Sequence, residues 1–197
     1  MKFLLIFLIL SIPVIYFSRR NLFHPGKHGF YRFLGWEGMI WLLVSIYKYW
    51  FVQSFSSLQL ISWILLLLSV YLVISGALTL LRKGKPSSKR HDRHLFSFEK
   101  TTELVDTGIF RYIRHPLYAS LICLSWGILL KNVTPLLLVI TLFCTLMFYI
   151  TSRFDEKECI AYFGEKYRNY MKRSHMFILF VYYRILLIRI LLIYKQI

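Results

Sequence analysis

Long apolar runs separated by polar loops are the dominant pattern of this chain. About 20 helical residues cross the hydrocarbon core of a bilayer, and hydrophobic residues make up 57% of the sequence. The runs that approach this length lie at about residues 3–18, 35–53, 57–81, 116–131 and 133–152. The pattern therefore predicts an all-α integral membrane protein with about five transmembrane helices.

The first two runs contain polar features that bear on this reading. The first run has a basic start, as a signal peptide does, but it lacks a small-x-small cleavage site and ends in Arg19-Arg20. Because that ending is typical of a stop-transfer segment, we expect an uncleaved first helix with a kink at Pro13. The second run carries Glu37 and Lys48, and we expect both near its ends, where side chains reach the interface.

Positive charge alternates from loop to loop. The second loop carries no charge, and the fourth has only Lys131. The basic loops are residues 19–32, 82–114 and 153–173. By the positive-inside rule this places the N-terminus outside and the basic loops in the cytoplasm. The net charge of +16 then reflects topology and contact with anionic membrane lipids, not nucleic-acid binding. We expect a multi-pass protein of a prokaryotic cell membrane.

Disulfide and metal chemistry are not indicated. The three cysteines are too few and too scattered for a disulfide framework. No CxxC spacing is present, and the His24-x-x-x-His28 spacing falls in a basic loop, so we predict no metal site. His24 and His28 lie in a basic loop, where we expect them to be solvated or to face lipid.

The third loop ends in a stretch with strong local signals. Its first part, residues 82–101, is polar and reads as irregular. Asp106 and Gly108 mark a turn, because glycine permits positive φ. Pro116 suits the first turn of the next helix, where its missing N–H costs nothing. His115 then lies at the N-terminal end of that helix, where the helix dipole favours an anionic ligand such as a carboxylate.

The segment after the fifth run has helical periodicity. The apolar positions recur three or four residues apart and predict an amphipathic helix, with Asp155 and Glu156 near its start. Gly164 indicates either a close approach by a neighbour or a helix break. Residues 176–197 are apolar apart from two arginines and predict a C-terminal helix, either interfacial or a sixth span. Residues 1–175 would form a single domain.

Two motifs flank the hairpin of the fourth and fifth runs. The first is Leu104-Val105-x-x-Gly108-x-Phe110-x-x-x-Arg114-His115-Pro116-x-Tyr118. The second is Asp155-Glu156 followed by Phe163-Gly164-x-x-Tyr167-x-x-Tyr170. In order and spacing they resemble the two signatures of the membrane isoprenylcysteine carboxyl methyltransferases and the related phospholipid methyltransferases. The resemblance covers about residues 100–173, which would be the catalytic part.

This resemblance implies an enzyme that binds S-adenosyl-L-methionine in a loop at the cytoplasmic face. It would methylate a lipophilic substrate entering from the bilayer, with a prenylcysteine-type carboxylate as the expected acceptor. Carried over by position, the cofactor contacts fall on Thr102, Glu103, Leu104, Val105, Phe110, Arg114, His115, Pro116, Leu117 and Tyr118. The catalytic, acceptor-side groups fall on Arg153, Asp155 and Glu156.

The chain departs from the signatures on the acceptor side. Asp155 stands where the family usually has Glu, Thr151 replaces a common Arg, and no proline-containing tail follows Tyr170. These departures bear on substrate identity more than on the cofactor. Methyl transfer to a lipid amine, such as a phospholipid headgroup, is the alternative. Two further alternatives are an NADPH-dependent sterol-type reductase, which shares an Arg-His-Pro-x-Tyr signature, and a membrane partner without catalytic activity.

Overall fold

The computed structural model describes residues 2–19, 21–52, 56–85 and 100–177, and within these ranges the chain is all-α. One isolated bridge, between Ile113 and His175, joins two loop segments. The helices, with a short 3₁₀ turn labelled η2, are α1 (Lys2–Ser18), α2 (His28–Ile46), α3 (Ser57–Lys83), η2 (Gly108–Arg111), α4 (Pro116–Leu129), α5 (Pro135–Phe163) and α6 (Glu165–Arg173).

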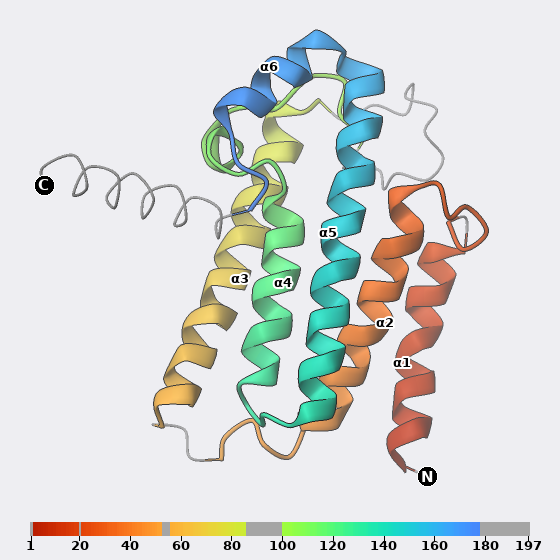
Figure 1. Ribbon diagram of the computed structural model, residues 1–197, viewed down its shortest axis with the longest axis vertical. Helices are drawn as coiled ribbons and strands as arrows, with labels where there is room; N and C mark the ends of the chain where they lie inside the picture. Colours follow the sequence, from red (N-terminus) through yellow and green to blue (C-terminus); the bar gives the residue numbers. More distant parts are fainter. Residues whose placement is uncertain (1, 20, 53–55, 86–99, 178–197) are drawn as a thin grey trace, which may run out of the picture.

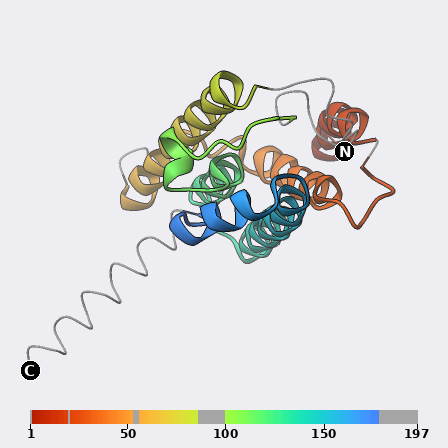
Figure 2. The same cartoon turned by 90° about the horizontal axis from the view of Figure 1, so that it is seen from above.

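The five long helices stand side by side as one bundle (Figure 1). Helix α2 packs against α1 and α5, while α4 packs against α3 and α5. The core of the bundle includes Leu42, Leu72, Ile128 and Phe148, none of which is exposed. Helix α6 and the segment that contains η2 lie over one end of the bundle, as the view from above also shows (Figure 2). The N-terminus lies at the opposite end.

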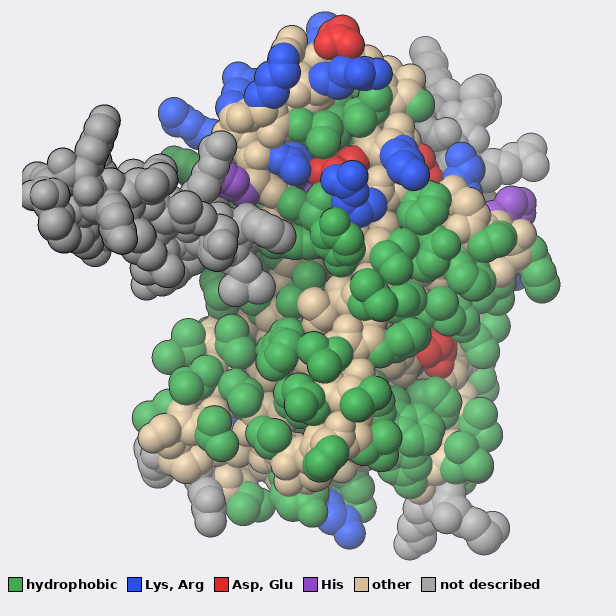
Figure 3. Space-filling model, viewed as in Figure 1, with side chains coloured by type: hydrophobic (Ala, Val, Ile, Leu, Met, Phe, Trp, Pro, Cys, Tyr) green, Lys and Arg blue, Asp and Glu red, His purple; other side chains and the backbone are tan. Residues whose placement is uncertain are grey.

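The outer surface of the bundle is apolar. Helices α3 and α5 are long and apolar enough to cross a membrane, and α1 and α4 are shorter apolar helices. Large apolar side chains such as Leu67 on α3 and Leu136 on α5 are exposed. Figure 3 shows this apolar surface over most of the bundle, with Lys and Arg gathered at the end that carries α6. An exposed apolar surface of this extent indicates a membrane protein.

The second predicted run was placed too late in the sequence. Helix α2 begins at His28 and ends at Ile46, and residues 47–52 form turns instead of helix. The sequence analysis assigned Arg32 to the first basic loop, but its guanidinium lies 5.4 Å from the Trp36 ring centroid and is buried. The side chain is thus accommodated within the bundle by a cation–π contact.

Glu37 therefore lies in the middle of α2 and not near an end, as the sequence had suggested. The hydroxyl of Ser11 on α1 donates a hydrogen bond of 2.6 Å to its carboxylate. The carboxylate is accommodated by this contact between two helices.

The region around Gly164 also differs from the prediction. Helix α5 continues to Phe163, so Asp155 and Glu156 lie inside it and not at the start of an amphipathic helix. Gly164 has φ 59° and ψ −134°, and a Cβ added there would meet nothing within 4 Å. Gly164 is therefore a helix break and not a site of close approach. The amphipathic helix is α6, which buries Tyr167 and Tyr170. The predictions for residues 178–197 and for most of the 82–101 loop lie outside the described residues.

Candidate active site

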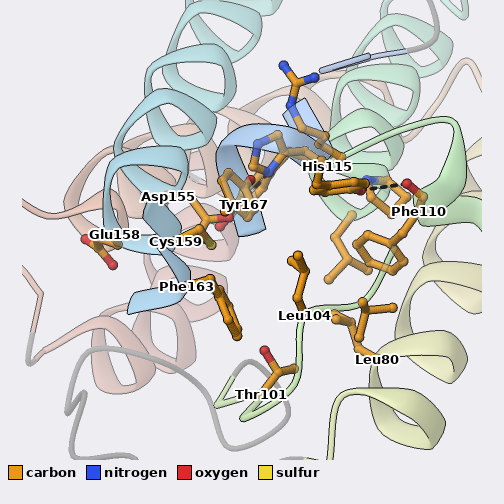
Figure 4. Close-up of a pocket in the computed structure, with 16 residues that line it drawn as sticks. Leu80, Thr101, Leu104, Phe110, His115, Asp155, Glu158, Cys159, Phe163 and Tyr167 are labelled. Carbon is orange, nitrogen blue, oxygen red and sulfur yellow. Dashed lines mark hydrogen bonds and ion pairs between the residues drawn. The ribbon is translucent and has the colours of Figure 1, made fainter. Parts of the chain in front are cut away.

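The two motifs meet at one pocket under α6. Its volume is about 100 Å³. The wall is built from the end of α3, the segment leading into α4, the last turns of α5, and α6 (Figure 4). The lining residues are Leu80, Thr101, Leu104, Val105, Phe110, Arg114, His115, Pro116, Leu117, Tyr118, Asp155, Glu158, Cys159, Phe163, Tyr167 and Tyr170.

Most of the predicted cofactor residues line this pocket, and two do not. Leu104, Val105, Phe110 and the Arg114–Tyr118 stretch all contribute to the wall. Thr102 and Glu103 turn away toward Lys85. The Thr102 hydroxyl donates 2.9 Å to the Lys85 carbonyl, and the Glu103 carboxylate lies 2.7 Å from the Lys85 ammonium. These two residues contact Lys85, just after the end of α3, and do not line the pocket.

A glycine turn, a backbone hydrogen bond and a helix cap place the first motif at the pocket. Gly108 has φ +61° and packs on Thr79 of α3, where a Cβ would lie 3.2 Å from the threonine hydroxyl oxygen. The chain then forms η2 and pairs with the segment after α6, since the Arg114 N–H donates 2.7 Å to the His175 carbonyl. His115 is the N-cap of α4 and Pro116 follows in its first turn, as the sequence predicts.

His115 is the buried polar centre of the pocket. Its Nδ1 lies 3.3 Å from the Asp155 carboxylate and its Nε2 3.6 Å from the Glu156 carboxylate, while the residue is only 4% exposed. Burial lowers the pKa of His115, but hydrogen bonding and attraction to the two carboxylates outweigh it and raise the pKa above its ordinary value.

Arg114 and Glu156 form a buried ion pair beside the pocket. Arg114 Nε lies 2.8 Å from Glu156 Oε1, and Arg114 Nη1 also donates to the carbonyls of Met171 and Ser174. Glu156 is 2% exposed, and its second oxygen lies 3.3 Å from Arg153 Nη1. Through these contacts Arg114 of the first motif holds the end of α6 and the residue that follows it in place.

The three predicted acceptor-side residues occupy different places. Asp155 lines the pocket and Glu156 lies behind it, whereas Arg153 is half-exposed and lines a neighbouring cavity. The cause is helical phase. With 3.6 residues per turn, residues two apart on a helix point about 200° apart, so Arg153 and Asp155 face nearly opposite directions. Arg153 and Glu156, three apart, share a face.

Several lining residues were missed by the sequence analysis. Glu158 and Cys159 follow Asp155 by three and four residues, so helical periodicity on α5 could have found them. His28 does not line the pocket but contacts Glu158, and the sequence carried no signal for this contact. The prediction that His28 is solvated or faces lipid was wrong. It is fully buried, and its Nδ1 lies 2.9 Å from the Glu158 carboxylate. Leu80 and Thr101 also belong to the wall.

Aromatic rings form much of the remaining wall. They are those of Phe110, Tyr118, Phe163, Tyr167 and Tyr170. The Tyr170 hydroxyl donates a 2.6 Å hydrogen bond to the Phe110 carbonyl and so joins the two motifs directly. The His115 and Tyr118 rings are stacked, with centroids 5.7 Å apart. Tyr112, a further aromatic of the first motif region, is exposed and does not line the pocket.

Comparison with known proteins gives a consistent picture. Residues 58–166, more than half of the chain, match the family described as Phospholipid methyltransferase. A methanethiol S-methyltransferase of Pseudomonas deceptionensis is 28% identical over 152 residues, covering 70% of this chain and 52% of that protein. A methanethiol S-methyltransferase of Crocosphaera subtropica is 28% identical over 130 residues, covering 64% of this chain and 47% of that protein.

This chain thus spans about half the length of the curated relatives that it matches. No solved structure matches it. The family match includes α3, α4 and α5 and therefore the whole pocket wall except Tyr167 and Tyr170 of α6. The chain belongs to the phospholipid methyltransferase family.

Proposed function

We propose that this protein is an S-adenosylmethionine-dependent methyltransferase that acts on a lipophilic acceptor at the membrane surface. The observation that carries the proposal is the convergence of both motifs on one pocket at the end of an apolar bundle. Membership of the family and similarity to two methanethiol S-methyltransferases support methyl transfer.

The lining residues fit the cofactor chemically. His115 Nε2 is buried, and apart from the Glu156 carboxylate at 3.6 Å it has no polar partner among the described residues. Together with the N-terminus of α4 it suits an anionic group such as the carboxylate of the methionine moiety. The faces of Phe110 and Tyr118 suit the methyl group of a sulfonium.

When bound, S-adenosylmethionine would supply an electrophilic methyl group on a sulfonium centre. The acceptor's electron pair would form the new bond to the methyl carbon, and the carbon–sulfur pair would remain on sulfur. The pocket contributes by holding the acceptor in line and excluding water, which is the main source of acceleration in such a transfer. An amine or thiol acceptor must also lose a proton, and Asp155 is the lining carboxylate beside His115 that can take it.

The acceptor class rests on the charges around the pocket. A prenylcysteine-type carboxylate needs a cation, and Arg153 would serve if the acceptor extends into the neighbouring cavity that Arg153 lines. A thiol is the second candidate, favoured because the lining cations Arg114 and His115 already face carboxylates and because the relatives are methanethiol S-methyltransferases. A lipid amine fits the same lining.

We propose five membrane spans with the site on the cytoplasmic side. The N-terminus lies at the end of the bundle opposite the pocket, which agrees with an odd number of crossings. Lys and Arg gather at the pocket end, as the positive-inside rule requires for a cytoplasmic face (Figure 3).

Binding and transfer assays on detergent-purified protein test the proposal in two steps. Calorimetry should detect S-adenosylmethionine binding but no NADPH binding; the reverse would indicate a reductase. His115→Ala should weaken cofactor binding, whereas Tyr112→Ala, a matched change in the same motif region outside the pocket, should not. Radiolabelled methyl transfer to a prenylcysteine analogue, an aminophospholipid and an alkyl thiol then identifies the acceptor class. Failure to methylate any of the three, with cofactor bound, would refute the proposed acceptors.

A further inference from the structure

A second cavity lies beside the pocket, between α5 and the chain that follows α6. Its volume is about 500 Å³, and Arg114 is the residue that it shares with the pocket. The lining residues are Arg114, Tyr149, Arg153, Met171, Lys172, Arg173, Ser174, His175 and Met176. Four of these are Arg or Lys, and none is Asp or Glu.

The cations of this cavity are only partly neutralised. Arg114 and Arg153 share the carboxylate of Glu156, and Arg173 pairs with Asp106. Lys172 contacts an amide oxygen, that of Asn169, at 3.2 Å. Among the described residues, two carboxylates therefore pair with these four cations, which leaves an excess of two positive charges around the cavity.

The position of the cavity matches the headgroup level of a bilayer. Its lower wall is Tyr149, one helical turn before Arg153 on α5, and half-exposed Tyr side chains are typical of the membrane–water interface. Below lies the exposed apolar surface of the bundle, and above lie the Lys and Arg side chains near α6 (Figure 3). An occupant here would have its polar end among cations and its apolar part along the helices.

We propose that this cavity binds the phosphate group of an anionic bilayer lipid, with Arg153, Lys172 and Arg173 as its donors. Guanidinium and ammonium groups recognise phosphate through charge-assisted hydrogen bonds. A carboxylate-rich surface would be needed to bind a cationic headgroup, and the lining offers none. The inference rests on the membrane placement proposed above but not on methyl transfer, so it is tested by binding alone.

The test uses the full chain in detergent and three probes. They are short-tailed phosphatidic acid, phosphatidylcholine with the same tails, and inorganic phosphate, with retained lipid measured by native mass spectrometry and affinity by titration. We expect phosphatidic acid to bind in preference to phosphatidylcholine, and inorganic phosphate to compete only weakly. Equal binding of the two lipids would overturn the proposal. Competition by inorganic phosphate as strong as that by the lipid would overturn the lipid as the occupant.

Charge-matched variants of α6 decide whether the cavity or the general surface charge is responsible. Lys172→Gln with Arg173→Gln removes two lining cations, whereas Lys166→Gln with Arg168→Gln removes two cations of the same helix that do not line the cavity. Each lining cation near a headgroup is worth about fivefold in affinity, so the first pair should lose roughly twenty-fivefold. The control pair should lose about twofold or less. Equal losses in the two pairs would show general surface attraction and refute the site.

Arg173 also contacts Asp106, so the double variant could disturb the fold. The single change Lys172→Gln avoids this, because among the described residues the Lys172 ammonium contacts the exposed Asn169 side chain and no carboxylate. Circular dichroism and gel filtration establish that each variant is folded. Lys172→Gln alone should weaken phosphatidic acid binding about fivefold; an unchanged affinity in this folded variant would contradict the proposal.

Discussion

Replacing Glu156 by Gln separates a positioning role of the acidic motif from a role in the chemistry. The change is nearly isosteric and removes one negative charge from a side chain that is almost fully buried. Glu156 accepts from Arg114 Nε at 2.8 Å and from Arg153 at 3.3 Å. In this structure it contacts other protein groups and does not line the pocket. We therefore expect Glu156 to be a positioning residue.

The size of the effect follows from what Arg114 holds. Its guanidinium also donates to the carbonyls of Met171 and Ser174, so the ion pair ties the chain after α6 to the first motif. A hydrogen bond to a charged partner contributes about 1.5–3 kcal/mol, and the Glu156→Gln variant should lose stability in that range. The pocket wall should loosen as well, because Tyr170 of α6 bonds to the Phe110 carbonyl.

Three measurements on one preparation test this reasoning. They are thermal unfolding in detergent, calorimetric cofactor binding, and turnover with a radiolabelled methyl donor. Glu156→Gln should lower stability and cofactor affinity together. Glu165→Gln, the same chemical change at a side chain that is 77% exposed, should alter neither. A Glu156→Gln protein with wild-type stability and cofactor affinity but turnover reduced about tenfold or more would refute the positioning role and place Glu156 on the acceptor.

Three further predictions follow from single features. The carboxylates beside His115 raise its pKa above 6.5 despite burial. The stability that the charged imidazole contributes is therefore full below pH 6.5 and is lost as pH rises through the raised pKa. The difference in thermal midpoint between wild type and His115→Gln should shrink over that pH range, and a constant difference would contradict the prediction. Gly164→Ala should destabilise by about 1–3 kcal/mol because of its positive φ, while Gly26→Ala, equally open but without positive φ, should be neutral in the same denaturation experiment. A cysteine placed at Ser56 should react with an impermeant thiol reagent from outside, and one at Ser88 only from inside; the opposite pattern would invert the topology.

Much of the architecture follows from the sequence alone because it depends on local chemistry. Apolar runs of bilayer length predict helices, and α1, α3, α4 and α5 occur close to where the runs lie. Pro116 is favoured in the first turn of a helix, which predicted His115 at the N-terminal end of α4, and His115 is its N-cap residue. The spacing within each motif was also visible, and the two motifs do meet, through Tyr170 and Phe110.

Tertiary structure decided which of the polar side chains share a site. The sequence analysis ended the fifth run at residue 152, which hid the helical phase that turns Arg153 away from the pocket and Asp155 into it. His28 and Glu158 lie 130 residues apart, and their contact arises only because α2 packs against α5. Periodicity reports the face of one helix, whereas a contact between helices depends on how their faces are rotated against each other. That rotation is set by packing across the whole bundle and is not encoded in any one segment.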